Sequence, residues 1–551
     1  MDSVLFHIRE KVAGFYSAHS HALVAGYLCI CCVIGLAFKC LIAVLQPLTS
    51  DTVVPGLMAM EIWNHQNLLV SDFVLPAPDP NILEDICFFF IPQVLSGFSP
   101  LVLKLTGYVQ FLVLILVFSL ILYSVLKNKT AVLLFIALMA SCCPSTEIWH
   151  LYYYASKYLL PVFHNSTVIF LGILMYLTFV KKWDTFPRII IPICILIIVT
   201  ISDSLLVIWF VVPLVVMYIL FWNTDYQPRP FFVVLAGIAS LFAHFIKYFN
   251  PMLFEYGDFT FKLFSRTDTD FSNFFTILQS YLVPDLSYPG QIPRSIIIIV
   301  IMAAIVVMAF YIKRTNLPEI DKGLVIFSLL SIVCTMGIII IFSEMDAWAY
   351  ISQIPVLAYL AAMIIIFHSH GRIAWAQYLL IFLVTVNLVM MAGPIASLNT
   401  SPNEEQYKLI DTLSQNGVRF AYANFWDANV ISYLSKDNLS VRSVQYEGIL
   451  APFIGGAMNI RWFERHAIAE MPLTLIIRTS DPGDLLPFIS KNQPDRLNDL
   501  DFYSVVQYDS LNQTAFTDVP KNWREKLGTI NIALSRILEK ITLLTKRPES
   551  S

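Results

Sequence analysis

Long apolar runs alternate with short polar breaks over residues 1–396. About eleven of these runs approach or exceed the ~18 residues that cross a bilayer as a helix. Their approximate limits are 22–45, 102–126, 130–146, 165–180, 189–202, 205–222, 231–249, 295–312, 324–342, 351–368 and 376–396. The pattern predicts a mainly α-helical, polytopic membrane bundle with long outer loops. The fifth and sixth runs are joined only by Ser202-Asp203-Ser204, and their combined length favours two helices over one kinked helix.

The composition agrees with a membrane protein. The 551 residues are 57% hydrophobic and 13% charged, with a mean hydropathy of +0.69. A soluble domain carries about 25% charged residues, roughly twice this share. The net charge of −4 says little about partners, because the charges are segregated by loop.

Basic residues gather in one set of loops, which predicts the orientation. That set contains Arg9, Lys11, Lys127, Lys129, Lys181, Lys182, Arg188, Arg229, Lys313, Arg314, Lys322 and Arg372, whereas residues 46–100 contain none. Because Lys and Arg are retained on the cytoplasmic side, the N-terminus is expected inside. An odd number of spans then places the C-terminal region outside the cytoplasm.

After Ala396 the chain becomes more polar. Residues 397–520 predict a small extracytoplasmic α/β domain, with helical periodicity over 403–415 and strand-like runs at 418–422, 440–444 and 473–478. Residues 521–551 are expected to form a terminal amphipathic helix and tail. Two predicted outer loops, 46–100 and 250–294, are long enough to indicate function. The first contains an expected amphipathic helix, Val54–Trp63.

Carboxylates mark the breaks on the predicted outer side. Asp51, Glu147 and Asp203 each lie in such a break, as do Glu344 and Asp346. Acids are costly beside hydrocarbon and tend to mark function. Several acids converging on one face suggest an active site or an ion path.

Two of these acids also have plainer interpretations. Asp51 precedes a helix expected to begin near Val54, where Asp is a good N-cap, and the same carboxylate could take a proton from an attacking hydroxyl. Asp203 needs a partner at this depth, which favours a functional role. Glu344 and Asp346 are also explained as ordinary loop acids.

A polar and aromatic cluster follows the third run. Glu147, His150 and Lys157 are spaced to share one helical face, with Tyr153 between them. This arrangement indicates either a plain interfacial helix with an aromatic belt or a pocket for a sugar or phosphate. A single Glu-x-x-His is weak evidence for metal, so no cofactor is assigned, and a divalent cation stays open.

Few cations occur on the predicted outer face. Lys247 and Arg266 bracket the second long loop, and Lys39 is expected to extend outward from the first span. Such groups suit either a phosphate ligand or lipid headgroups. No Walker A loop, dinucleotide fingerprint, GxSxG or HExxH motif is present, and nothing points to nucleic acid.

This layout resembles the GT-C class of membrane glycosyltransferases, which use a sugar linked to a polyprenyl phosphate. The shared features are an acid after the first span, at Asp51, a long first outer loop, a second acidic and aromatic outer loop, and a soluble outer domain at the end of the chain. Within the class it is most similar to the lipid-linked mannosyl-, arabinosyl- and aminoarabinosyl-transferases. The resemblance covers residues 1–396 in topology and implies the cytoplasmic membrane of a bacterium or archaeon.

The resemblance also implies site residues. Asp51 matches the general base or acceptor-positioning acid, Glu147 and His150 match the polar cluster, and Lys247 and Arg266 fall where donor phosphate binds. With Asp203, the candidate catalytic acids are therefore Asp51, Glu147 and Asp203. Expected substrate contacts come from His150, Tyr153, Lys157, Lys247, Arg266 and Tyr350. The stretch 349–355 departs from some relatives, because it lacks a basic residue before Tyr350.

The implied reaction is transfer of a single sugar, with inversion, from a polyprenyl-phosphate donor to a glycan, lipid or protein acceptor outside the cytoplasm. Three alternatives remain open. They are a polymerase or ligase of lipid-linked glycans, a glycolipid transporter or flippase, and a scaffold protein. In a scaffold protein, Trp426-Asp427 and Arg461-Trp462 would line a carbohydrate surface or serve packing.

Overall fold

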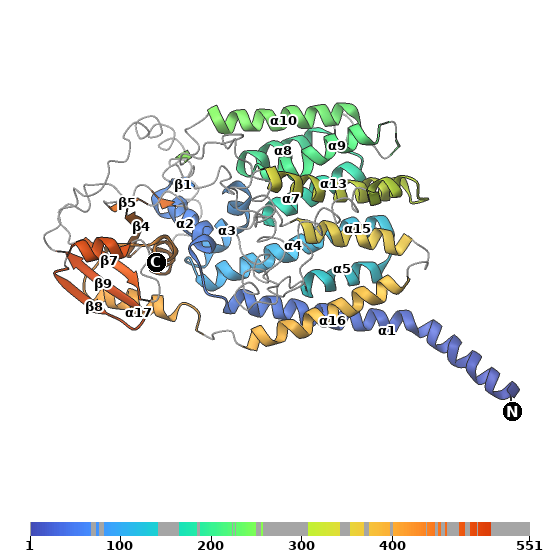
Figure 1. The fold of residues 1–551 in the computed structure, drawn as a ribbon, viewed down its shortest axis with the longest axis horizontal. Coiled ribbons are helices and arrows are strands. Elements are labelled where there is room, and N and C mark those ends of the chain that lie inside the picture. The colour runs from blue at the N-terminus through green and yellow to red at the C-terminus, as the bar shows by residue number, and fades with distance from the viewer. Residues whose placement is uncertain are drawn as a thin grey trace, which may run out of the picture.

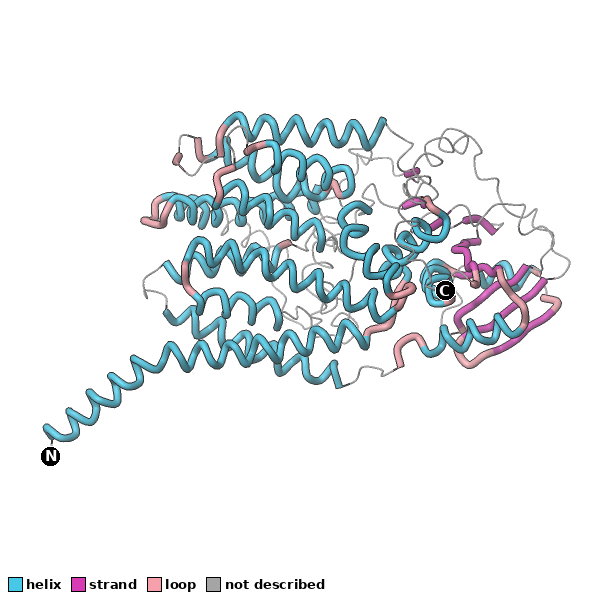
Figure 2. Tube along the Cα trace, turned by 180° about the vertical axis from the view of Figure 1, so that it is seen from behind, coloured by secondary structure: helices cyan, strands magenta, loops and turns pink. Residues whose placement is uncertain are grey.

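The computed structural model is mostly helical, with a helix bundle at one end and two sheets at the other (Figure 1). Both sheets lie away from the N-terminus of the chain, as the reverse view also shows (Figure 2). The structure describes residues 2–67, 73–75, 82–141, 165–183, 188–222, 224–225, 228–249, 255–256, 307–341, 353–368, 374–396, 401–436, 438–446, 450–452, 458–459, 473–479, 485–492 and 494–508.

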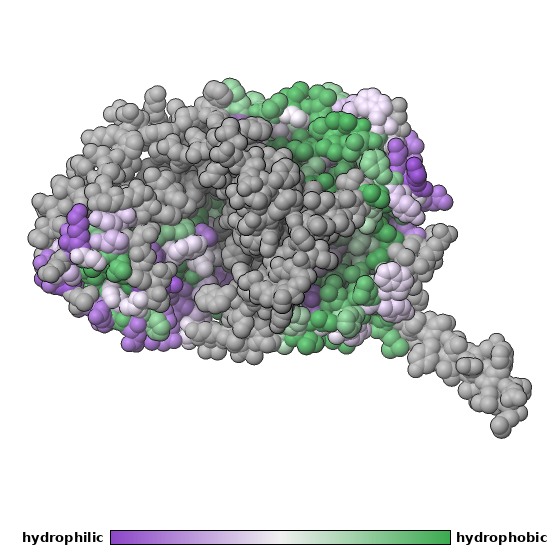
Figure 3. Space-filling model, viewed as in Figure 1, coloured by the Kyte–Doolittle hydropathy of each residue, from purple (hydrophilic) through white to green (hydrophobic). Residues whose placement is uncertain are grey.

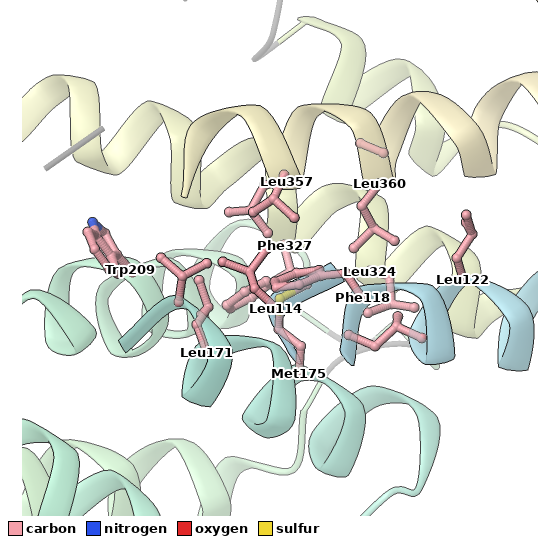
Figure 4. Packing of buried hydrophobic residues seen from close by; sticks show 14 of the residues in the cluster. Leu114, Phe118, Leu122, Leu171, Met175, Trp209, Leu324, Phe327, Leu357 and Leu360 are labelled. Carbon is pink, nitrogen blue, oxygen red and sulfur yellow. The ribbon is translucent and has the colours of Figure 1, made fainter. Parts of the chain in front are cut away.

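The bundle consists of apolar helices that share one hydrophobic core. They are α1 (Asp2–Leu45), α4 (Pro100–Leu126), α5 (Lys129–Ser141), α7 (Asn165–Met175), α8 (Ile190–Ser202), α9 (Val212–Leu220), α10 (Pro230–Phe249), α13 (Glu319–Ile341), α15 (Ile354–His368) and α16 (Ala374–Ala396), with π-helical segments η1 (Tyr176–Val180) and η2 (Val207–Val211). Leu114 and Phe118 of α4 meet Met175, Phe327 and Leu360 from three other helices (Figure 4).

Large apolar side chains also cover much of the outside of the bundle. Leu120, Ile198, Phe242 and Phe382 are each more than half exposed. A hydrophobic surface crosses the bundle between polar ends (Figure 3). A continuous apolar surface of this kind suits a lipid environment, in which helices satisfy their own backbone hydrogen bonds.

Three described helices are long and apolar enough to cross a membrane: Ala22–Leu45, Pro100–Leu126 and Trp375–Ala392. Several other described apolar helices are shorter, at 10–17 residues, among them Lys129–Ser141, Ile190–Ser202 and Ile354–His368. Membrane association is therefore supported, while a bundle of eleven spans stays a prediction. Part of the predicted runs, including most of 295–312, lies outside the described residues.

The bundle has two chemically different ends. We call one the basic end, because the short connections there carry Lys127, Lys181, Lys182, Arg188, Arg229, Lys313 and Arg314. The other is the domain end, where the 46–100 segment and the C-terminal sheet lie (Figure 1).

The chain reverses direction at Asp203, as expected for two helices. Thr167, at the start of α7, contacts Asp203. Phe210 instead packs on Phe327 with ring centroids 5.6 Å apart, and Phe327 packs on Phe179 at the far end of η1. The chain after Asp203 therefore runs back along α7–η1, so that η2–α9 is directed opposite to α8.

Two helices of the first long loop lie between the bundle and the C-terminal sheet. They are α2 (Ser50–His65) and α3 (Ile82–Leu95). The helix expected at Val54–Trp63 is confirmed as part of α2, but the expectation that it is amphipathic is wrong, because this segment is buried on nearly all sides. Its neighbours are α3 on one side and α18 (Phe425–Leu434) of the C-terminal region on the other. Leu57 and Met60 of α2 share one apolar cluster with Leu409 and Ile431.

The described residues of the C-terminal region form a six-stranded mixed sheet with three helices. The strand order is β5 (Leu450–Pro452), β4 (Ser440–Tyr446), β3 (Phe420–Ala423), β7 (Leu473–Arg478), β9 (Tyr503–Tyr508) and β8 (Arg496–Asp499). Strands β4, β3 and β7 are parallel. The helices are α17 (Glu404–Gln415), α18 and α19 (Leu486–Lys491). The helix predicted at 403–415 and the three predicted strands coincide with α17, β3, β4 and β7. The predicted helix 521–547 lies outside the described residues.

A second, three-stranded sheet joins segments that are far apart in sequence. Its order is β2 (Glu255–Tyr256), β1 (Phe73–Leu75) and β6 (Met458–Asn459). Val74 of the first loop pairs with Glu255 of the second loop on one side and with Met458 on the other. Both long loops and the C-terminal region therefore meet at the domain end.

Candidate active site at the domain end

The structure describes two of the three candidate catalytic acids. Asp51 and Asp203 both lie at the domain end, while Lys247 occupies the last turn of α10. The other predicted site residues lie outside the described residues, and so do the two loop acids: Glu147, His150, Tyr153, Lys157, Arg266, Tyr350, Glu344 and Asp346.

Asp51 occupies the first turn of α2 and is partly exposed. The N-cap is Thr49, which forms a capping box with Thr52, so the interpretation of Asp51 as the cap of a helix starting near Val54 is wrong. The first turn of a helix carries partial positive charge from its free N–H groups, which stabilises an ionised carboxylate. Asp51 is therefore a partly accessible carboxylate at the start of a rigidly packed helix.

A second acid of α2 was missed by the sequence analysis. Glu61 is 4% exposed, and Asn67, itself buried, donates from Nδ2 to Glu61 Oε1 at 3.2 Å. A buried carboxylate needs such partners to remain charged. The available signal was the same one that singled out Asp203, since Glu61 is flanked by Met60 and Ile62 in an apolar helix.

Asp203 lies at the break between α8 and η2 and is fully buried. One oxygen accepts a hydrogen bond from the Thr167 hydroxyl, and the other accepts from the main-chain N–H of Leu205 at 2.9 Å. The second bond is the local turn that Asp favours before a helix. Asp203 thus organises the ends of α7, α8 and η2, and its carboxylate is held in a fixed position by these two hydrogen bonds.

Two lysines are buried where α1 packs on α4. Lys104 Nζ donates to the Val44 carbonyl at 3.1 Å, while Lys39 Nζ lies 6.0 Å from the Phe111 ring centroid. Lys39 is fully buried, so the expectation that it extends outward is wrong. Positive charge near the last carbonyls of α1 is favoured by the helix dipole.

The Trp426-Asp427 pair divides into two roles. Asp427 is buried and pairs with Arg478 at 2.5 Å, while Tyr503 Oη donates to the same carboxylate oxygen at 2.9 Å. Burial acts to lower the pKa of Arg478, but attraction and hydrogen bonding to Asp427 outweigh it, and the pKa is raised. Asp427 is therefore a packing residue. Trp426 is 57% exposed beside it. Arg461 and Trp462 lie outside the described residues.

The described part of this site offers acid–base chemistry. Within the described residues, no group of three or more His, Cys, Asp or Glu is placed to hold a metal ion. A partly exposed carboxylate at a helix start can accept a proton from a hydroxyl group within hydrogen-bond reach. Through β1 and β2, Val74 of the first long loop and Glu255 of the second lie side by side.

Neither the protein-family models nor the curated proteins contain a match to this chain.

Proposed function

We propose that this protein is a membrane glycosyltransferase that moves a single sugar from a polyprenyl-phosphate donor to an acceptor outside the cytoplasm. The observation that carries the proposal is the position of Asp51. It is a partly exposed carboxylate in the first turn of α2, where the apolar bundle meets the C-terminal region. A base at that boundary would meet a lipid-linked donor from one side and a polar acceptor from the other.

The proposed reaction is a one-step displacement. The Asp51 carboxylate takes the proton of the acceptor hydroxyl while the oxygen of that hydroxyl forms a bond to the anomeric carbon of the sugar. The bond from that carbon to the phosphate oxygen breaks, and polyprenyl phosphate leaves with the electron pair, which inverts the configuration. Cations near the leaving phosphate would stabilise its charge, and we assign Lys247 and Arg266 to this role. Sugar contacts are assigned to Glu147, His150, Tyr153, Lys157 and Tyr350.

Three further features support the proposal. The apolar surface of the bundle suits a prenyl chain. The strands β1, β2 and β6 bring both long loops to the same end as Asp51, where they would exclude water from the reacting groups. Asp203, with both oxygens accepting hydrogen bonds, is built to hold the helix ends of the site in place, so Asp51 is our choice for the base.

The test is complementation of a strain that lacks this protein. Surface glycans and glycolipids would be compared by mass spectrometry with those of the parent strain. Loss of a single sugar, restored by the wild-type protein, supports transfer. Loss of whole polymer, or build-up of intact lipid-linked glycan on the cytoplasmic side, contradicts it and favours polymerisation or flipping.

The variants Asp51→Asn, Asp51→Glu and Asp411→Asn sharpen this test. Asp51→Asn keeps the size of the side chain and removes the base, so it should restore less than about 1% of the sugar, in line with loss of general-base catalysis by ~10²–10⁴-fold. Asp411 is an exposed acid on α17 and serves as the matched control with full restoration. Normal restoration by Asp51→Asn at equal membrane abundance would remove the assignment.

A lipid or glycan transporter is the second candidate, and one observation favours it. The break at Asp203 is followed within four residues by η2, and η1 continues α7. Short π-helical segments and helix breaks are frequent at functional sites in membrane proteins. The described break lies at the domain end of the bundle, next to the start of α7, which fits a site at that surface better than one at the membrane midplane.

A further inference from the structure

The turn between α1 and α2 is fixed by a residue from the C-terminal region. Asn403 Oδ1 accepts a hydrogen bond from the Leu48 N–H at 2.9 Å, and Asn403 Nδ2 donates to the Leu48 carbonyl at 3.3 Å. One amide therefore satisfies both backbone polar groups of a residue 355 positions earlier. Leu48 and Asn403 are both buried, so water competes little for these bonds.

A second contact of the same kind lies two residues further on. The Ser50 hydroxyl donates to the Phe425 carbonyl, at the start of α18, and Ser50 is fully buried. Thr49 and Thr52 also bond to one another and close the first turn of α2 around Asp51. Asp51 follows Ser50 directly. The backbone that carries the Asp51 carboxylate is therefore held by the C-terminal region as well as by the first turn of α2.

The conformation of Asn403 suits this task. Asn403 stands at the N-cap of α17 with φ 65°, yet its side chain makes no capping bond to its own helix. Asn normally caps a helix at this position, and it also tolerates the left-handed region better than most residues. Here the Asn403 amide hydrogen-bonds to the backbone of Leu48 instead of capping its own helix.

We propose that Asn403 is a positioning residue for Asp51, which makes the C-terminal α/β region a working part of the catalytic site. This inference rests on the proposed function, because it assumes that the location of the Asp51 carboxylate limits the reaction rate. A displacement of about 1 Å in a reacting group can cost ~10²-fold in rate. The inference predicts that loss of the Asn403 amide lowers transfer while the protein remains folded.

The test uses three variants of the full chain in membranes. Asn403→Gly removes the amide and keeps the left-handed backbone at no steric cost. Asn403→Asp tolerates the same backbone and keeps an acceptor for the Leu48 N–H, but it cannot donate to the Leu48 carbonyl. Lys436→Gly is the matched control, because Lys436 also has a left-handed backbone conformation, with φ 54°, and its side chain is exposed.

Two measurements are made on each variant: restoration of the missing sugar in the deletion strain at limiting expression, and hydrogen–deuterium exchange of peptides covering residues 46–52 in detergent. We expect Asn403→Gly to restore the sugar ~10–100-fold more slowly and to exchange faster at 46–52. Asn403→Asp should be intermediate in both, and Lys436→Gly should match the wild type. Partial rescue by Asn403→Asp separates positioning from general destabilisation.

The outcomes distinguish this inference from the proposed function. If Asp51→Asn is inactive while Asn403→Gly restores the sugar normally, the positioning role is overturned and the base assignment stands. If Asp51→Asn is active, the base assignment fails whatever Asn403 does. If Asn403→Gly fails to accumulate in the membrane, the Asn403→Asp variant provides the test. Sugar restoration by Asn403→Asp at the wild-type rate, together with wild-type hydrogen–deuterium exchange at residues 46–52, would overturn the inference.

Discussion

The hydroxyl of Thr167, in the first turn of α7, donates a hydrogen bond to the carboxylate of Asp203 at the break between α8 and η2. Both side chains are fully buried. With the N–H of Leu205 on its other oxygen, Asp203 links two chain segments at the domain end through one carboxylate. The strength of this link follows from burial, because water does not readily replace a donor that is removed from a buried acceptor.

Thr167→Val should therefore destabilise the bundle. Valine has nearly the shape of threonine but no hydroxyl, which leaves one Asp203 oxygen with one donor fewer in a buried place. We expect a loss of about 1–3 kcal/mol, seen as a lower thermal unfolding midpoint in detergent. Thr167→Ser keeps the hydroxyl and should lose less than half as much. Equal midpoints for Thr167→Val and the wild type would show that this hydrogen bond contributes nothing.

Gly56→Ala should loosen the contact between α2 and α18. A Cβ atom at position 56 would lie 2.4 Å from Cε2 of Tyr433, whose buried ring is fixed by its own hydrogen bond. Relief requires α2 or α18 to shift, at a cost of about 1–3 kcal/mol. Gly237→Ala is the control, because nothing lies within 4 Å of a Cβ there. Thermal unfolding in detergent should separate the two, with Gly237→Ala unchanged or slightly more stable.

Tyr433→Phe should destabilise the protein through Gln93 of α3. Tyr433 Oη donates to Gln93 Oε1 at 2.7 Å, and Gln93 Nε2 has no hydrogen-bond partner among the described residues. The substitution leaves the whole buried amide unsatisfied, at a cost of about 1–3 kcal/mol. Adding Gln93→Leu removes the stranded group and should recover most of the loss. Additive effects in this double-mutant cycle would contradict the coupling.

The basic end holds a titratable pair that the sequence analysis missed. Asp321 precedes the apolar stretch that begins at Leu324, and its Oδ2 lies 2.8 Å from His368 Nε2. Burial raises the pKa of Asp321 to about 6, more than attraction to His368 lowers it. The folded state then holds the proton more tightly than the unfolded state, so stability falls as pH rises from about 4 to about 6 and is level above that window.

Asp321→Asn should remove this dependence. The thermal midpoint of the wild type, measured in detergent, should fall as pH rises through that window, and that of Asp321→Asn should change less. Asp411→Asn, an exposed acid on α17, is the control and should keep the wild-type slope. A slope in Asp321→Asn equal to that of the wild type would assign the effect to another group.

Local patterns predicted several elements well. The run at 473–478 is mostly apolar and β-branched, the run at 440–444 has Val at positions 441 and 444, and they became β7 and β4. The Ser202-Asp203-Ser204 break became a chain reversal, because Asp can close the turn with its own side chain. The N-cap of α2 was predicted at Asp51, whereas Thr49 caps the helix. Both side chains can cap a helix, and only the backbone conformation decides between them.

Long-range contacts could not be predicted in the same way. The segment 54–63 was expected to be an amphipathic helix with one exposed face, because its sequence gives no sign that Tyr433 would cover Gly56. Glu61 did carry a signal in its apolar neighbours Met60 and Ile62, but the contacts that bury α2 come from α3 and α18. Of the candidate site, the location of Asp51 and Asp203 at one end of the bundle agrees with the expectation, while the remaining site residues stay predictions.

The placement of α2 also imposes an order on how the protein is made. Its apolar side chains, Leu57 and Met60 among them, leave the ribosome long before Leu409 and Tyr433, which cover them in the finished molecule. During that interval the apolar side chains of α2 are exposed on the translocating chain and can associate with other proteins. A nascent polypeptide that stops short of α18 would therefore be a substrate for quality-control proteases, even with every membrane helix already inserted.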